Sequence, residues 1–131
     1  MIIFLYGRIE WYNMSRVQEI IERKKIRKKE LETALESIKH QLIELGAIKI
    51  ILFGSLNIDD INIYSDLDLF VIMPSVKTGK EWMDYIYQNI ERDIASDIIT
   101  YNENEFKKKK DDNSFISEII KTGTIIYEAK S

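Results

Sequence analysis

The 131-residue sequence contains no cysteine, and it has only one proline and one histidine. The absence of cysteine excludes disulfides, thiolate nucleophiles and cysteine-based zinc sites. It is also typical of proteins that work in a reducing compartment. The one histidine, His40, lies on a predicted helix, and a single imidazole cannot build a metal site. We therefore assign no catalytic or metal-binding role to either residue type.

Long apolar runs are also missing. No stretch approaches the roughly 20 residues that a membrane-spanning helix needs. The N-terminal "MIIFLY" has neither a basic region before it nor a small-residue cleavage site after it, so it does not resemble a signal peptide. We expect a soluble, cytoplasmic protein.

An excess of positive charge is absent as well, because the formal net charge is −3. No global basic field therefore indicates a nucleic acid partner. The basic residues are densest in two runs, "ERKKIRKKE" (Glu22 to Glu30) and "KKKK" (Lys107 to Lys110), which we interpret as solvated helix faces. Hydrophobic residues make up 45% of the chain, enough for the core of one compact domain.

The first predicted element is a helix that begins at Ser15, where Ser15 and Gln18 match a capping box. Gly46 is a natural stop for it. The charged middle of this region allows either one long helix or two helices with a joint. Apolar residues at helical spacing form one stripe, which we assign to the core rather than to an interface: Leu31, Leu35, Ile38, Leu42 and Leu45.

The rest of the chain alternates between predicted strands and helices. Buried strands are predicted at 48–53 and 67–73, with shorter strands at 96–100 and 124–128. Helices are predicted from the Thr78–Glu81 capping box to about residue 92, after Asn102, and over 114–123. This order indicates an α+β domain with a mixed sheet packed by helices. We divide the chain into an N-terminal arm, residues 1–14, which forms either an edge strand or a partner-binding arm, and a domain, residues 15–131.

Two aspartates at the start of the second strand carry the first chemical signal. Side chains on a strand alternate between faces, so Asp66 and Asp68 point the same way. Two like charges at this spacing repel unless a cation lies between them. Hard carboxylate oxygens of this kind suit Mg²⁺. The plain alternative is a solvated strand entrance.

A Gly-Ser break ends the first strand, and ten residues separate it from Asp66. Gly54 lets the backbone approach a ligand closely, and Ser55 offers a hydroxyl and an N–H. Such a turn can hold a phosphate, although an ordinary strand-ending turn has the same sequence. Asp97 opens the third strand. If that strand pairs beside the second, Asp97 lies next to Asp66 and Asp68.

The ordered combination of "LFGS", "DLDLFV" and "SDIIT" resembles the minimal nucleotidyltransferases of the DNA polymerase β-like superfamily. The resemblance covers about residues 38–128, and it implies the small nucleotidyltransferase fold with a long N-terminal helix. It implies that Gly54 and Ser55 contact the triphosphate of an NTP such as ATP. It also implies that Asp66 and Asp68 hold Mg²⁺. Asp97 is by the same resemblance a third metal ligand and the base for an acceptor hydroxyl.

The loop after Gly-Ser departs from the family pattern at two positions. Family members often carry an arginine directly after Gly-Ser and a glycine three residues later, where this chain has Leu56 and Asp59. The loop thus lacks a cation and gains carboxylates, which weakens the binding of a triphosphate. Lysines elsewhere are candidates to compensate: Lys77, Lys80 and the run from Lys107 to Lys110.

The resemblance implies transfer of a nucleoside monophosphate, with AMP preferred, to a protein or other hydroxyl acceptor. Small family members often act beside a HEPN-type helical protein, as the antitoxin that attaches AMP to the toxin. The chain is short, so we expect the acceptor to be held by a HEPN-type protein partner or by a second copy of the chain. The rival reading is a degenerate protein of the same fold that neutralises a partner by contact alone. A nucleic-acid-binding module built on the lysine runs is a weaker third reading.

Overall fold

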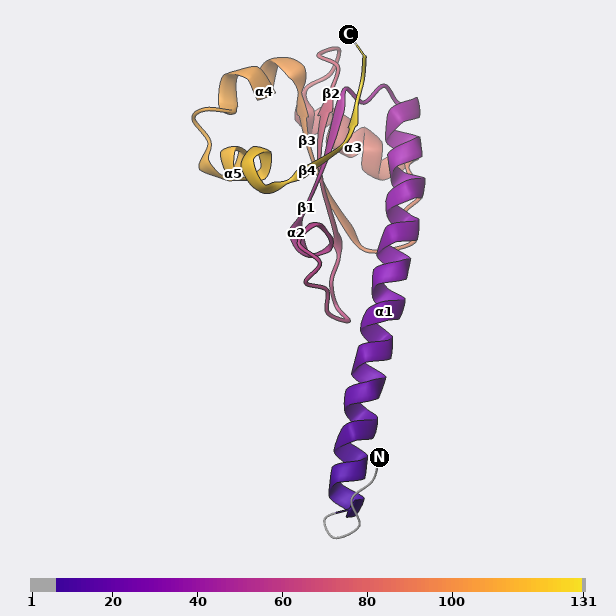
Figure 1. Cartoon of the computed structure of the whole chain (residues 1–131). Coiled ribbons are helices and arrows are strands. Elements are labelled where there is room, and N and C mark those ends of the chain that lie inside the picture. Colours follow the sequence, from indigo (N-terminus) through magenta and orange to yellow (C-terminus); the bar gives the residue numbers. More distant parts are fainter. Residues whose placement is uncertain (1–6, 131) are drawn as a thin grey trace.

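In the computed structural model, the backbone is described for residues 7–130 and the side chains for residues 15–130. Helix α1, Gly7–Glu44, is continuous and projects well beyond the rest of the molecule (Figure 1). The predicted helix start at Ser15 is therefore wrong. The preceding residues contain no proline, and extending an existing helix costs far less than starting one. The strand alternative for the arm is likewise wrong over residues 7–14, while residues 1–6 lie outside the described part.

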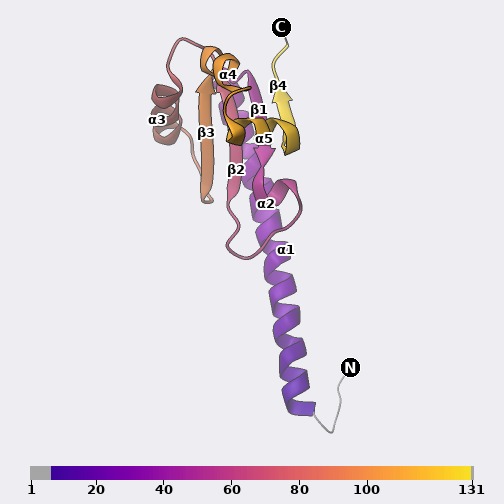
Figure 2. The same ribbon diagram turned by 90° about the vertical axis from the view of Figure 1, so that its left-hand side faces the viewer.

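Four strands form one mixed sheet in the order β3-β2-β1-β4 (Figure 2). Strand β1, Lys49–Phe53, pairs antiparallel with both β2, Leu67–Met73, and β4, Thr124–Glu128. Strand β3, Ser96–Asn102, pairs parallel with β2. The four predicted strands are confirmed. The parallel pairing places the beginnings of β2 and β3, with their aspartates, at the same end of the sheet.

Helices cover both faces of this sheet. Helix α3, Gly79–Asn89, lies on the same face as α1, while α4, Glu103–Lys109, and α5, Ser114–Thr122, lie on the other (Figure 1). Two of the predicted caps are present, because Thr78 and Glu81 form a full capping box and Asn102 caps α4, whereas Ser15 lies inside α1 and caps no helix. The sequence did not predict α2, Gly54–Asn57, a single turn directly after β1.

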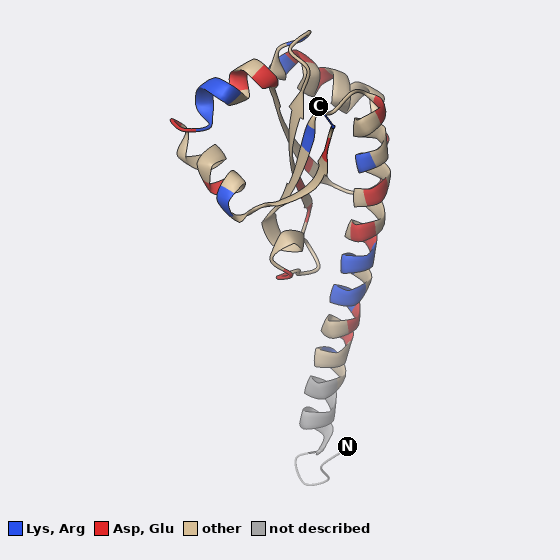
Figure 3. Cartoon of the chain, turned by 45° about the horizontal axis from the view of Figure 1, so that its top comes forward, with Lys and Arg blue, Asp and Glu red and all other residues tan. Residues whose placement is uncertain are grey.

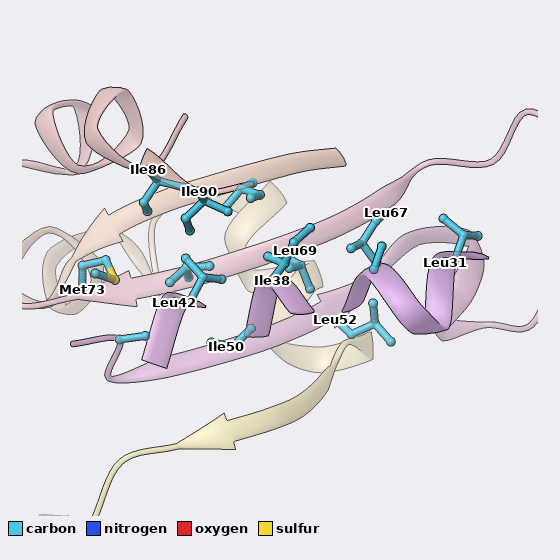
Figure 4. Close-up of a cluster of buried hydrophobic side chains, with 14 of the residues drawn as sticks. Leu31, Ile38, Leu42, Ile50, Leu52, Leu67, Leu69, Met73, Ile86 and Ile90 are labelled. Atoms are coloured by element: carbon cyan, nitrogen blue, oxygen red, sulfur yellow. The ribbon is translucent and has the colours of Figure 1, made fainter. Parts of the chain in front are cut away.

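The main core lies between α1 and the sheet (Figure 4). The predicted apolar stripe of α1 belongs to it, since Leu31, Ile38 and Leu42 are fully buried against Leu67 and Leu69. A smaller cluster on the opposite face joins Ile51 and Phe70 to α5. Within residues 7–130, no helix has the length and the apolar composition that crossing a membrane requires.

Candidate active site

Three aspartates meet at the end of the sheet where β2 and β3 begin. Asp68 and Asp97 are direct partners in the parallel register, and Asp66 immediately precedes β2. Leu67 and Leu69 point into the core under α1, so Asp68 lies on the α4–α5 face, as does Asp97. The structure therefore brings the three predicted carboxylates together.

The pKa of the Asp68 carboxyl is perturbed by its surroundings. Partial burial, followed by the charges of Asp97 and Asp66, raises the pKa of Asp68 above its ordinary value. Both causes penalise the ionised carboxylate, and both would be offset by a cation placed among the three oxygen donors. The electrostatics of the cluster thus favour a bound cation.

The carboxylates are neighbours, but they do not converge on one point. Across the described residues, no three acidic or histidine side chains are placed so that they could hold a metal ion as they stand. The Asp66 side chain is 55% exposed, and Asp97 is exposed as well.

Gly54 occupies the position where β1 ends beside Asp68. Its φ angle is +77°, in the left-handed region that favours glycine. A β-carbon there would lie 2.1 Å from Oδ2 of Asp68. The sequence predicted that Gly54 lets the backbone approach a ligand closely; in the structure, the Asp68 carboxylate lies in the space that a side chain on Gly54 would fill.

Gly54 and Ser55 are the first two residues of α2, and hydrogen bonds tie the end of this short helix to Thr122 and Thr124. Phe53 is the N-cap of α2 but offers no side-chain hydrogen bond to it. At the other end, Asn57 donates to the Thr122 carbonyl (3.0 Å) and accepts from the Thr124 hydroxyl. Ser55 therefore lies on a turn held in place from the α5–β4 junction.

The two departures from the family pattern have different structural consequences. Leu56 packs against the main core and is not free to face a phosphate. Asp59 has a φ angle of +55°, a conformation that glycine adopts easily and that Asp tolerates better than most residues. Nζ of Lys28, on α1, lies 2.9 Å from Oδ1 of Asp59, and this carboxylate raises the pKa of Lys28. The extra negative charge thus has a cation beside it.

A second basic residue of α1, Arg27, reaches the aspartate cluster. Its Nε donates to the Ser65 carbonyl (2.9 Å), and its Nη2 lies 3.8 Å from Oδ1 of Asp66. Sequence reasoning missed Arg27 and Lys28, because their basic run reads as a solvated face. Spacing could have indicated Arg27, because it lies one helical turn before Leu31, on the same face of α1 as the apolar stripe that packs on the sheet.

The lysines proposed from sequence as compensating cations lie elsewhere. Lys77 follows the far end of β2, where its Nζ sits 5.2 Å from the centre of the Trp82 ring. The run from Lys107 to Lys110 is in and just after α4, which follows the far end of β3. Figure 3 shows these lysines on α4, away from the acidic turn after α2. His40 is exposed on α1.

A cavity of about 310 Å³ lies beside the aspartates rather than over them. It is formed by α1 and the segment before β3, with Arg27, Glu30, Ser37 and Asp93 among its lining residues. Arg27 therefore stands between this cavity and Asp66. None of the residues that line the cavity belongs to β2 or β3, so the cavity lies on the α1 side of the sheet and does not include the three aspartates of the cluster.

Comparison with known proteins gives one family and one similar structure. A family model described as a nucleotidyltransferase domain matches residues 29–129. A crystal structure of a protein from Sulfolobus solfataricus, provisionally assigned as a nucleotidyltransferase, aligns with a TM-score of 0.49 and 18% identity. The alignment covers 82% of this chain and 86% of that chain. None of the curated proteins matches the chain.

Proposed function

The chain belongs to the nucleotidyltransferase domain family, and from this premise we propose that it is an Mg²⁺-dependent enzyme that transfers AMP from ATP to a hydroxyl acceptor. The observation that carries the proposal is the strand register. It sets Asp68 beside Asp97, with Asp66 at the start of the same strand and the Gly54–Ser55 turn adjoining. These are the residues that the proposed reaction needs at one place.

The donor set fits a hard divalent cation. Carboxylate oxygens are the ligands that Mg²⁺ prefers. Burial, followed by the charges of Asp97 and Asp66, raises the pKa of Asp68, and a cation beside these carboxylates would offset both effects. We propose Asp66, Asp68 and Asp97 as the ligands, with Asp66 and Asp97 turning toward Asp68. When bound, Mg²⁺ would neutralise negative charge on the phosphates during transfer.

The chain's own residues have two further tasks in this proposal. The backbone of Gly54 and the hydroxyl and N–H of Ser55 hold the β- and γ-phosphates, because no side-chain cap covers the start of α2. Asp97, exposed at the edge strand, accepts the proton of the acceptor hydroxyl. The acceptor oxygen bonds to the α-phosphorus, the bond from that phosphorus to the β-phosphate bridging oxygen breaks, and pyrophosphate leaves.

We further propose that the acceptor is a protein, with a HEPN-type helical partner preferred to a second copy of the chain. The projecting part of α1 supports a protein partner (Figure 1). Val17, Ile20 and Ile21 share one face of the helix, and they leave 46–54% of their surface exposed there. Apolar side chains gathered on a projecting helix are typical of a surface that another protein covers.

A second candidate function is neutralisation of a partner by contact alone. Two observations favour it, namely the carboxylates of Asp59 and Asp60 beside the phosphate turn and the absence of a convergent metal site among the described side chains. In that case the fold would be kept as a binding surface while nucleotide transfer was lost.

Label transfer distinguishes the two functions. The chain is incubated with Mg²⁺, a co-purified protein partner and ATP labelled either at the α- or at the γ-phosphorus. Transfer of AMP predicts that only the α-label becomes bound to protein, and that Asp66→Asn/Asp68→Asn abolishes the labelling. If no label transfers and the double variant still neutralises the partner, the contact-only function holds instead.

A further inference from the structure

Asp66 lies at the end of an irregular stretch that has its own internal bonds. The connecting segment, residues 58–66, runs from α2 to β2. The Asn62 N–H donates to the Ser65 hydroxyl (2.9 Å), and the Tyr64 N–H donates to the Asn62 side chain (2.7 Å). These bonds shape the turn before Asp66, but none of them fixes the turn to the rest of the domain.

Arg27 makes a connection between that turn and α1. Its side chain is only 20% exposed, and the Ser65 whose carbonyl it binds is buried. The Nε and Nη2 groups lie on one edge of the planar guanidinium. Because Nε is held by the Ser65 carbonyl, Nη2 is directed at Asp66. Nη1, on the other side, lies 3.6 Å from Oε1 of Glu30.

We infer that Arg27 is a positioning residue, whose guanidinium holds the Ser65–Asp66 backbone against α1 and thereby fixes the place of Asp66 beside Asp68. The inference rests on the proposed function, because the place of Asp66 matters to metal binding only if Asp66 binds a cation. Lysine cannot replace Arg27 in this role. An ammonium group is a point charge on a flexible stem and lacks the rigid edge with two donors.

Lys28 provides a natural contrast one residue later. It is bonded to the same connecting segment, but at Asp59 rather than Asp66, and it is 43% exposed. Both residues lie just outside the stretch that matches the family model, residues 29–129. Because Lys28 contacts Asp59 and Arg27 bonds the Ser65 carbonyl, a substitution at Lys28 changes the charge of α1 beside the segment but leaves the bond to the Ser65–Asp66 backbone in place.

The decisive variant is Arg27→Lys, because it keeps the charge and removes the geometry. Binding of Mn²⁺ alone, as a probe for Mg²⁺, is measured by electron paramagnetic resonance of the free ion, with Lys28→Met as the matched control. We expect Arg27→Lys to weaken Mn²⁺ binding about 10-fold or more, the usual effect of losing a group that orients a metal ligand. Lys28→Met should stay within about twofold of the wild type.

Hydrogen exchange of the connecting segment supplies a readout that does not depend on metal. Amides at residues 62–66 should exchange faster in Arg27→Lys than in the wild type or Lys28→Met, with thermal unfolding midpoints alike. Equal Mn²⁺ affinity and equal exchange rates in Arg27→Lys and the wild type would overturn this inference and leave the proposed function standing. A folded wild type that binds no Mn²⁺ would overturn the proposed function, and this inference with it.

Discussion

The carboxylate of Asp68 occupies the space that a side chain on Gly54 would need. A β-carbon on Gly54 would lie 2.1 Å from Oδ2 and 2.9 Å from Cγ of Asp68, closer than any packed atoms can be. The glycine that shapes the phosphate turn and the aspartate that opens the metal cluster are thus coupled directly. A side chain at position 54 therefore fits only if the Asp68 carboxylate moves.

Gly54→Ala should therefore damage the site more than the fold. Gly46 supplies the matched control, because its φ angle is also positive, at +100°, while its nearest neighbour, Pro74, lies 3.7 Å from a built β-carbon. Both alanine variants should lose about 1–2 kcal/mol of unfolding free energy from left-handed strain, measured by urea denaturation. Only Gly54→Ala should also lose Mg²⁺-dependent ATP binding. Equal ATP binding in the two variants would contradict the coupling.

Asp68→Asn should make the apo protein more stable at neutral pH. Its raised pKa means that the folded state holds the Asp68 proton more tightly than the unfolded state does. The stability that this proton contributes is present below the ordinary value of 3.8 and is lost as the pH rises through the folded-state pKa. Asparagine removes the charge penalty. The variant should thus melt higher than the wild type at pH 7, with the difference shrinking toward pH 4.

Two controls accompany that comparison. Asp84→Asn removes an exposed carboxylate on α3, so it changes the net charge by the same amount but leaves the aspartate cluster intact. Mg²⁺ should raise the melting temperature of the wild type but not that of Asp68→Asn, because only the wild type keeps the ligand. An Asp68→Asn variant that melts below the wild type at neutral pH would show that the carboxylate stabilises the apo fold.

Asp59→Gly should strengthen nucleotide binding at little cost to stability. Glycine adopts the left-handed conformation at φ +55° without strain. The substitution also removes the exposed ion pair with Lys28, so the Lys28 ammonium no longer has Asp59 as its partner. A unit charge about 4 Å away in water is worth about 1 kcal/mol, so the dissociation constant for Mg²⁺–ATP should fall by roughly two- to fivefold. The unfolding free energy should change by less than about 1 kcal/mol.

Asp60→Asn is the control for Asp59→Gly, since it removes the neighbouring charge and leaves the backbone conformation alone. Calorimetric titration should show a similar gain in ATP affinity for both variants if charge near the turn is what limits binding. An affinity that is unchanged in both would remove the acidic loop from the account of nucleotide binding.

Local signals in the sequence predicted most of the fold and the meeting of the aspartates. Alternation on "DLDLFV" placed Asp66 and Asp68 on one face, and a strand opening with Asp97 needed only a parallel pairing to join them. The capping boxes at Thr78 and the cap at Asn102 are also local patterns, and both are present.

Local sequence patterns could not predict the contacts between segments that are distant in the sequence. Arg27 binds a carbonyl 38 residues away, and nothing in a basic run says which of its members turns inward. The left-handed backbone at Asp59 was hidden because aspartate replaces the glycine that marks such positions. The true start of α1 was missed because a capping box is a local preference that an uninterrupted helix overrides.

The most direct test of the account is calorimetric titration of ATP, and then of the other nucleoside triphosphates, into the purified chain with and without Mg²⁺. The wild type is compared with Asp66→Asn/Asp68→Asn, and circular dichroism confirms that both are folded. The account predicts binding that requires Mg²⁺ and disappears in the double variant. It is contradicted if the folded wild type binds no nucleoside triphosphate, or if the double variant binds as tightly as the wild type.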